Sequence, residues 1–373
     1  MSIKNCVRIP SWQAKFQRPR LATSLAMGLA LATCLLASFA HSQSSSDWLY
    51  AVERPVAVQS VQARNEAAAD GLLEILSRMT GLISVPRTPA VVKALAKPEA
   101  LYNQFVFFSR TQDGGNAQNY VRISFEATAI QTLVESARLP VWWSQRPSVM
   151  VWLVLDSGGE REILDATSTH PMVLALKARA RQRGIAITLP LMDLDDTLAV
   201  SAADVWGKLG QTVDVAAQRY GADLVLVGRA SDDHYGEEAA TTFRGDWEVW
   251  LDEQPLAKNF TALEAQKAAH IGIDLLVDQL VEQYAVLPRA PRIQRLAIGG
   301  VKNPAGYAEL MRYLSSLEFV NEVDVAAISA SSLQLNVTSR AEVKQLLMLL
   351  TANGRLIEDS FSRGADIRLL WQG

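Results

Sequence analysis

Two acidic clusters have the residue types and spacing that suggest metal chemistry. The first is the run Asp232-Asp233-His234-Tyr235-Gly236-Glu237-Glu238. Its carboxylates and imidazole are ligands that a divalent cation accepts, and Asp232, Asp233 and His234 are the first candidates. The glycine spacing of a calcium-binding EF-hand loop is absent. The alternative is a polar loop between two strands, with its charges in water.

The second cluster is Asp193-Leu194-Asp195-Asp196, directly after a predicted strand at Ile185–Leu189. Ligands of α/β proteins bind at the carboxyl ends of parallel strands. Asp156 and Ser157 end a second predicted strand in the same way. Together with Asp193, Asp195 and Asp196, they suggest a metal site or a hydrolytic site. The alternative is that Asp195 or Asp196 caps a helix while the other carboxylates are solvated.

Other catalytic patterns are absent from the sequence. There is no Gly-x-Ser-x-Gly nucleophile elbow, and none of His170, His234 and His270 lies in a His-Glu-x-x-His motif. The pair Gly299-Gly300 follows a predicted strand but lacks the Lys-Ser/Thr of a phosphate-binding loop. We therefore assign no catalytic residue and expect no cofactor.

A tryptophan pair suggests an interaction site instead. Trp142 and Trp143 lie beside Arg146 in the proline-bounded segment 139–147. Tryptophan and arginine are enriched in the residues that dominate binding energy at protein interfaces. The segment either exposes a docking site or packs a first domain against a second one.

The elements that position these residues form three groups. An edge strand near 48–58, a helix at Val61–Met79, a hairpin and a helix at Ala129–Arg138 predict a small α+β domain at 47–140. Strands and helices that alternate over 148–287 predict an α/β domain with a mainly parallel sheet. A β-α-β-β-α-β order over 292–373 predicts a ferredoxin-like domain.

The first 42 residues have the order of a signal peptide: basic, then apolar, then small and polar. Cleavage is expected after Ala40 or Ser42. Lipidation at Cys34 and retention as a membrane anchor are the alternatives, and they are the only membrane attachments that we expect. The sequence therefore predicts an exported, periplasmic protein of a Gram-negative cell.

Removal of this leader changes the composition. The whole chain has 36 basic and 39 acidic residues, and the leader holds five of the basic ones, which leaves a net charge of −8. An acidic chain disfavours nucleic acid as a partner. Both cysteines, Cys6 and Cys34, also lie in the leader. The mature protein would have no disulfide and no thiol chemistry.

Several motifs resemble a known family. They are Gln62–Ala69 running into Arg78-Met79-Thr80-Gly81, the strand Tyr102–Phe105, Leu139–Trp142, Arg146-Pro147 and Val151–Leu153. In their order they resemble a family of exported gammaproteobacterial proteins, domain of unknown function 2066, over most of 47–285. The resemblance implies export and no particular activity.

A second similarity concerns the middle of the chain. The passage Tyr220–Gly228 resembles the helix-to-strand passage in the amino-terminal domain of the periplasmic Tol-system protein TolB. It is an analogy of fold, and it implies no site.

These observations leave three functions open. The leading hypothesis is a non-enzymatic binding or scaffolding protein of the cell envelope, with other envelope proteins as partners. The second is a metal-dependent or hydrolytic enzyme with its site at the carboxyl ends of the central strands. The third is a protein that binds a small ligand in an apolar pocket of the central domain.

Overall fold

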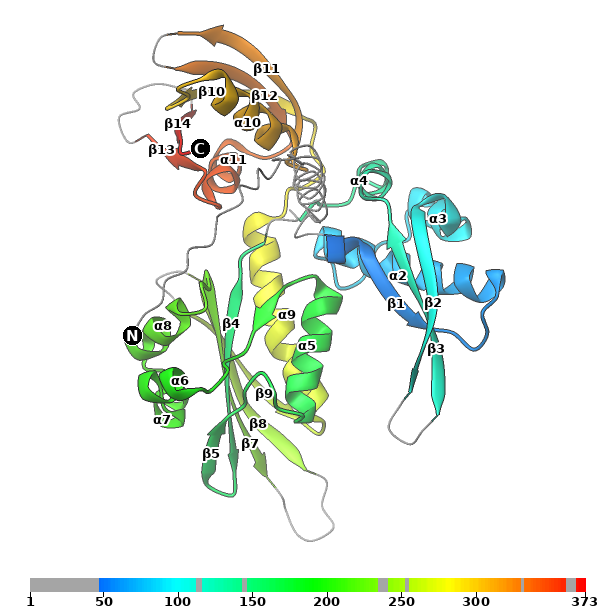
Figure 1. The fold of residues 1–373 in the computed structure, drawn as a ribbon, viewed down its shortest axis with the longest axis vertical. Coiled ribbons are helices and arrows are strands. Elements are labelled where there is room, and N and C mark those ends of the chain that lie inside the picture. The colour runs from blue at the N-terminus through cyan, green and yellow to red at the C-terminus, as the bar shows by residue number, and fades with distance from the viewer. Residues whose placement is uncertain are drawn as a thin grey trace, which may run out of the picture. The chain divides into compact units, whose positions relative to one another are not determined.

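Three β-sheets with helices packed on them form the described part of the chain, a mixed α and β architecture (Figure 1). The computed structural model describes residues 47–111, 116–142, 146–233, 241–251, 255–329, 332–359 and 367–373. The predictions on the leader, on Trp143, on His234 and on the side chain of Asp233 lie outside these residues. None of the described helices is long and apolar enough to cross a membrane.

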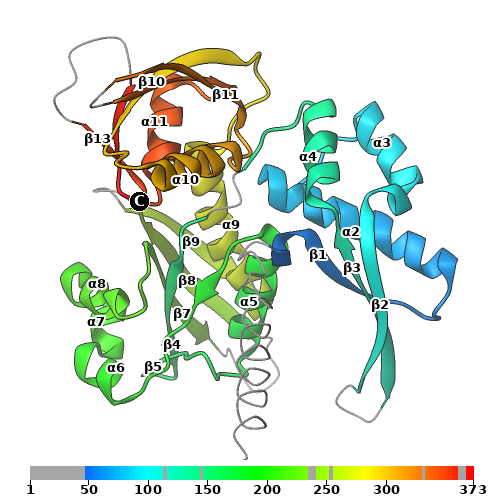
Figure 2. The same cartoon turned by 45° about the horizontal axis from the view of Figure 1, so that its top comes forward.

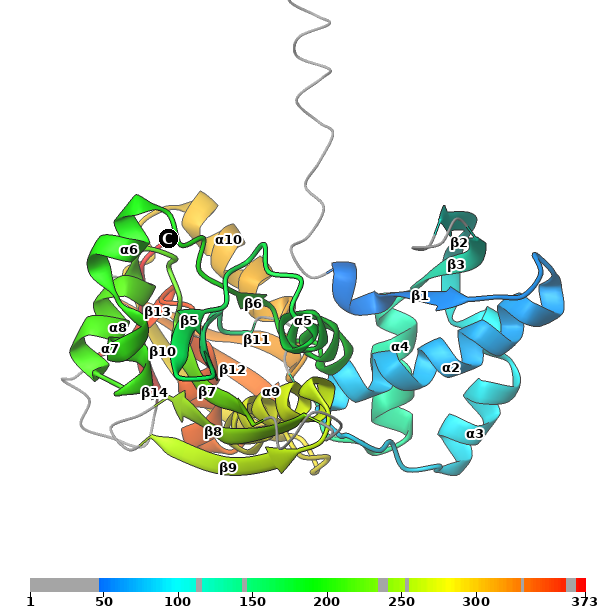
Figure 3. The same ribbon diagram turned by 90° about the horizontal axis from the view of Figure 1, so that it is seen from below.

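The N-terminal sheet is antiparallel, in the order β1-β3-β2, and α2, α3 and α4 lie on one face of it (Figure 3). Ser60 caps α2, and Gly81 ends it in a left-handed conformation. The predicted edge position of β1 is confirmed. The elements are η2 (Asp47–Tyr50), β1 (Ala51–Pro55), α2 (Val61–Thr80), α3 (Pro89–Ala96), η3 (Pro98–Ala100), β2 (Tyr102–Thr111), β3 (Ala117–Phe125) and α4 (Ala127–Ser136).

The central sheet has six strands and helices on both faces (Figure 1). Because successive residues of β4 point to opposite faces, Val151 packs with α5 and α9 while Trp152 packs in a core with residues of α7 and α8. The elements are β4 (Val149–Ser157), β5 (Glu160–Ile163), α5 (Pro171–Arg183), β6 (Ile187–Thr188), α6 (Leu194–Ala199), α7 (Ala202–Trp206), α8 (Gly210–Gln218), β7 (Leu224–Asp233), β8 (Thr242–Trp250), β9 (Leu256–Ala262) and α9 (Ala265–Tyr284).

The central sheet is mixed, which corrects the prediction of a mainly parallel sheet. Strand β4 pairs in parallel with β6 and β7, but β5, β8 and β9 pair antiparallel with their neighbours. The reason is the kind of connection. Only the connections that contain helices bring the chain back in parallel, whereas Gly158 and Gly159, both at positive φ, turn β4 directly into β5.

Trp247 of β8 fixes the packing of α9 on this sheet. Its indole nitrogen donates a 2.8 Å hydrogen bond to the carbonyl oxygen of Ala268. Gly228 of β7 and Gly272 of α9 lie against its ring, and a Cβ atom at either position would overlap that ring. The large side chain therefore fits only because two glycines flank it.

The sequence pattern predicts one helix over Ala203–Tyr220, and the structure divides it into two, which is a second correction. The chain leaves α7 at Gly207, takes a positive φ of 53° at Lys208, and begins α8 at Gly210. Lys208 is held there by ion pairs with Asp246 and Glu248 of β8. The hydrophobic periodicity of a helix cannot reveal ion pairs to residues so distant in the sequence.

The C-terminal sheet has the order β11-β12-β10-β14-β13, and α10 and α11 lie on one of its faces (Figure 2). The predicted ferredoxin-like order is present, with one strand more than expected. Strand β14 pairs in parallel with β10 and separates it from β13. The elements are β10 (Arg292–Gly299), α10 (Pro304–Ser315), β11 (Val320–Ile328), β12 (Leu333–Ser339), α11 (Val343–Thr351), β13 (Leu356–Glu358) and β14 (Ile367–Trp371).

Candidate functional site

Asp196 lies at the centre of a hydrogen-bonded clamp after strand β6. Its side chain is 1% exposed. One carboxylate oxygen accepts the backbone N–H groups of Leu191 and Met192, at 3.1 and 2.9 Å, and the hydroxyl of Tyr220, at 2.5 Å. The other oxygen accepts a guanidinium N–H of Arg219 at 2.8 Å. A buried carboxylate with this many donors fixes the loop that precedes α6.

The neighbouring acids share the same arginine. Asp193 caps α6 by accepting the backbone N–H of Asp196 at 3.1 Å, so the cap is Asp193 rather than the expected Asp195 or Asp196. Hydrogen bonds from Arg219 and from the backbone N–H of Asp196 lower the pKa of Asp193 to about 2. Asp195 points to solvent, 4.0 Å from Arg219.

The carboxylates of Asp193 and Asp196 therefore converge on a guanidinium rather than on an open space. In the described part of the chain, no group of three or more His, Cys, Asp or Glu side chains is arranged to hold a metal ion. The geometry is that of a capped and clamped helix start. The metal site at Asp193, Asp195 and Asp196 stays a prediction, without geometric support here.

Helix α6 has the reverse of an ordinary amphipathic pattern. Its acid Asp196 is buried, whereas Leu194 and Leu198 are 72% and 78% exposed, and the preceding Leu191 is 55% exposed. Leu194 and Leu198 are four residues apart, so they lie on one face of the helix. We call Leu191, Leu194 and Leu198 the leucine knob.

The carboxyl ends of β4 and β7 carry the other predicted polar residues. The side chain of Ser157 donates to Asp232 at 3.1 Å, and Asp156 pairs with Arg161 at 2.9 Å. Asp232 contributes to the electrostatic environment of His170, the residue that caps α5. Asp156 and Asp232 are therefore near one another, but Asp193, Asp195 and Asp196 have different partners. The predicted joint site stays a prediction.

Trp142 is buried, and the half-buried Arg146 packs against it. Trp142 is 1% exposed, and the guanidinium of Arg146 lies 3.8 Å from the centre of its ring. Arg146 also donates to the carbonyl oxygens of Arg78 and Gly184. A buried tryptophan offers no surface to a partner. The expected docking role of Trp142 is thus corrected to the alternative, packing between elements of the N-terminal and central sheets.

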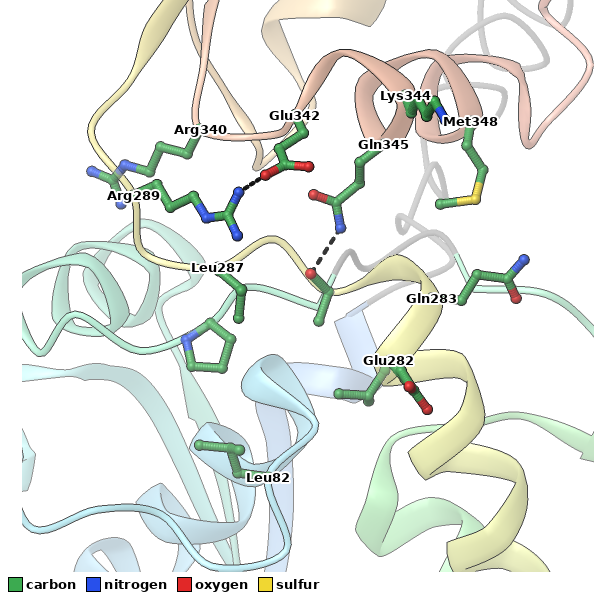
Figure 4. A pocket seen from close by; sticks show the side chains of 13 residues that line it. Leu82, Glu282, Gln283, Leu287, Arg289, Arg340, Glu342, Lys344, Gln345 and Met348 are labelled. Atoms are coloured by element: carbon green, nitrogen blue, oxygen red, sulfur yellow. Dashed lines mark hydrogen bonds and ion pairs between the residues drawn. The ribbon is translucent and has the colours of Figure 1, made fainter.

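The described residues line a cavity of about 600 Å³ (Figure 4). Figure 4 shows that its side chains come from three regions: the end of α2 and of α4, the end of α9, and the start of α11. This volume lies in the range of ordinary ligand pockets. Its apolar lining includes Leu82, Pro140, Val281, Leu287 and Met348.

Charged and amide side chains lie around this apolar lining. Arg289 pairs with Glu342, and the side-chain amide of Gln345 donates to the carbonyl oxygen of Ala285 at 2.9 Å (Figure 4). Arg340 lies 3.6 Å from Glu135. Among the described residues, no ion pair engages Lys344. The cavity therefore combines an apolar wall with an available cation.

Sequence reasoning missed both the leucine knob and the cavity. A signal for the knob exists, since Leu194 and Leu198 are spaced at i and i+4 around the acids. The same spacing is typical of a buried helix face, however, and so it does not predict exposed leucines. The cavity has no such signal, because its lining residues are up to about 266 positions apart, from Leu82 to Met348. Only the fold brings them together.

Comparisons with known proteins give a family of unknown function. A family model described as "Domain of unknown function (DUF8605)" matches residues 45–143. It differs from domain of unknown function 2066, which the motifs resemble. No curated protein matches the chain. The crystal structure of lipoprotein GNA1162 from Neisseria meningitidis is 19% identical, covers 37% of this chain and 96% of its own, and has a TM-score of 0.21. The N-terminal part of this chain is thus similar to a domain of unknown function.

Proposed function

We propose that this protein is a non-enzymatic binding module of the periplasmic cell envelope and that the leucine knob is its docking element. The observation that carries this proposal is the reversed burial on α6, with Asp196 buried and Leu194 and Leu198 exposed. Exposed leucines gathered on one helix face mark interaction sites, because their contact with water is unfavourable until a partner covers them.

The clamp supports the proposal because it holds the knob rigidly before any partner arrives. The hydrogen bonds of Asp196 fix the backbone of Leu191 and Met192, and the cap at Asp193 fixes the first turn of α6. A binding element that is already ordered loses less conformational entropy when it binds. The acids therefore serve binding by positioning apolar side chains.

The envelope location rests on the leader. Residues 1–42 have the pattern of an export signal, and residues 43–373 contain no cysteine. A chain without cysteines is suited to an oxidising compartment, where stray disulfides would otherwise form. Other envelope proteins are then the available partners.

Site-specific photo-cross-linking in cells tests this function. A photoreactive amino acid is placed at Leu194 or at Leu198, the cells are irradiated, and adducts are detected by gel electrophoresis and mass spectrometry. We expect one discrete protein adduct from both positions. Combining the probe at Leu194 with Leu198→Asp should abolish it, since a carboxylate cannot enter an apolar contact.

Leu174 is a matched control position. It is 54% exposed on α5, a helix that packs on the same sheet and contains no residue of the knob. A probe there should give no such adduct. If neither knob position yields an adduct, or if Leu174 yields the same ones, the knob is not the docking element.

A further inference from the structure

We propose that the cavity of Figure 4 receives the leucine knob of a second copy of this chain, so that the protein self-associates head to tail. The inference rests on the proposed function, because it names the partner of the knob. The cavity and the knob share no residue, so one copy can present both at once. Each copy then gives its knob to one neighbour and takes a knob from another.

The surfaces match first in polarity. The knob offers three leucine side chains, all more than half exposed. The cavity offers an apolar wall that includes Leu82, Leu287 and Met348 within about 600 Å³. Burying these apolar groups against each other removes both surfaces from water, and that is the main favourable term in association. Methionine adapts well to a leucine partner because its side chain is unbranched.

The surfaces match also in charge. The knob is flanked by Asp195, whose side chain is 78% exposed and whose nearest cation, Arg219, is 4.0 Å away and already paired with Asp193 and Asp196. The cavity carries Lys344, which is exposed at the start of α11 and has no ion pair among the described residues. Glu282 also lines the cavity without an ion pair among the described residues, but together with Arg289, Arg340, Glu342 and Lys344 the charged lining side chains sum to +1, opposite in sign to Asp195. Such rim pairs direct the orientation of binding partners.

A symmetric knob-to-knob contact fits less well. In an isologous dimer the same patch meets itself, so the two Asp195 carboxylates would face each other. Like charges in that position oppose binding. A heterologous contact avoids this and continues from copy to copy, either closing into a ring or extending as a filament.

Sedimentation velocity over a range of protein concentrations tests the inference. We expect the average mass of the purified protein to rise with concentration beyond that of one chain. The Leu194→Asp/Leu198→Asp variant should stay monomeric at those concentrations, with a dissociation constant raised at least about tenfold. Circular dichroism and the melting temperature verify that the variant is folded.

An exchange of charges between the knob and the cavity tests how the two copies are oriented, and it includes a control for folding. Asp195→Lys and Lys344→Asp are each made alone and should each weaken self-association, since like charges then meet. Mixing the two variants should restore self-association. The lysine on the knob of the Asp195→Lys variant then meets the aspartate in the cavity of the Lys344→Asp variant, and the unaltered Asp195 of the second variant meets the unaltered Lys344 of the first. Restored mass in the mixture also demonstrates that both variants are folded.

The outcomes separate this inference from the proposed function. A protein that stays monomeric at every concentration overturns the inference, as does a mixture that remains monomeric. Cross-links from Leu194 and Leu198 to another protein would then still support the knob as a docking element. If monomers are found and cross-links are also absent, both proposals are wrong.

Discussion

Asp196 illustrates, at the residue scale, how a carboxylate in an acidic run can be structural. Four donors surround it, and they come from the loop before α6, from Tyr220 and from Arg219. Burial and the hydrogen bond to Asp196 both raise the pKa of the Tyr220 phenol, with burial the larger cause. The tyrosine therefore remains a donor at any physiological pH.

Asp196→Asn should destabilise the protein. The amide keeps one acceptor oxygen but places an NH₂ group where Arg219 or the backbone N–H groups now donate. Losing such bonds in a buried site costs about 1–3 kcal/mol of the free energy of unfolding. Urea denaturation measures it.

Asp195→Asn is the matched control for that measurement. Asp195 is exposed and makes only a long contact with Arg219, so its change should stay within about 0.5 kcal/mol. Equal effects of the two substitutions would contradict the clamp, and a loss of bound divalent metal in the Asp196 variant would restore the metal site.

His170 should make stability depend on pH. Burial lowers its pKa below the ordinary 6.5, although Asp232 and Glu162 oppose this, and its Nδ1 accepts the backbone N–H of Met172 at 3.2 Å. The unfolded chain therefore binds a proton at a higher pH than the folded chain does. Stability then rises with pH through the window just below 6.5 and is lost as pH falls through it.

His170→Asn removes that contribution while keeping a good N-cap residue. The melting temperature of the variant should fall less than that of the unaltered protein between pH 7 and pH 5. His270, whose pKa is also lowered by burial, still titrates in both proteins, so the melting temperature of the variant still depends on pH to some extent. Identical slopes would contradict the assignment to His170.

At the scale of elements, the end of α5 shows how a helix stop is coupled to packing. Gly184 ends α5 at a φ of 75°, and a Cβ atom there would collide with the guanidinium of Arg146 and lie 3.0 Å from side-chain carbons of Arg78. Gly184→Ala should therefore add crowding, about 1–3 kcal/mol, to the strain of a left-handed residue.

Gly221→Ala separates these two costs. Gly221 has a φ of 61°, and nothing lies within 4 Å of an added Cβ atom. Its substitution should cost only the backbone strain, about 1 kcal/mol. If the melting temperatures of the two variants fall equally, crowding of Arg146 and Arg78 at Gly184 makes no measurable contribution to the loss of stability.

The regular elements could be predicted from sequence because local signals determine them. Ser60 and Gly81 delimit α2, and the alternation in β10 and β12 identifies half-buried strands. The division at 47–140, 148–287 and 292–373 stays a prediction. The prediction of strand directions in the central sheet is wrong because two antiparallel strands have a weak sequence signal: β9 is exposed over most of its length, and β5 has four residues, two of them glutamates.

The candidate site could be located but not interpreted from sequence. The run Asp193–Asp196 marks the right segment, yet its meaning depends on Arg219 and Tyr220, which lie 23 and 24 positions beyond Asp196. Periodicity cannot tell that Leu194 is outside and Asp196 inside. That requires knowing which face α8 covers, and this is a tertiary property.

At the scale of the whole molecule, two buried arginines connect elements of the N-terminal and central sheets. Arg78 of α2 donates to the carbonyl oxygen of Arg181 at 2.9 Å, and Arg183 of α5 donates to that of Gly81 at 3.0 Å. Both side chains are about 1% exposed. Because a buried guanidinium has no water to replace a lost partner, these bonds are costly to break.

The double variant Arg78→Met/Arg183→Met should therefore uncouple the two sheets. Methionine keeps apolar contacts but cannot donate to the carbonyl groups, and hydrogen bonds from a charged group are worth about 1.5–3 kcal/mol each. In differential scanning calorimetry we expect the unaltered protein to unfold both sheets in one transition. The variant should show an earlier, separate transition for the N-terminal sheet, whose core lies apart from that of the central sheet.

Arg161→Met serves as the control because Arg161 pairs with Asp156 inside the central sheet and is 41% exposed. It should leave a single transition. A double variant that still unfolds in one step would mean that apolar packing alone couples the sheets, for example the close packing of Gly81, at the end of α2, against Val281 of α9. The arginines would then stabilise each sheet separately, and substitution of Val281 would be the change that uncouples them.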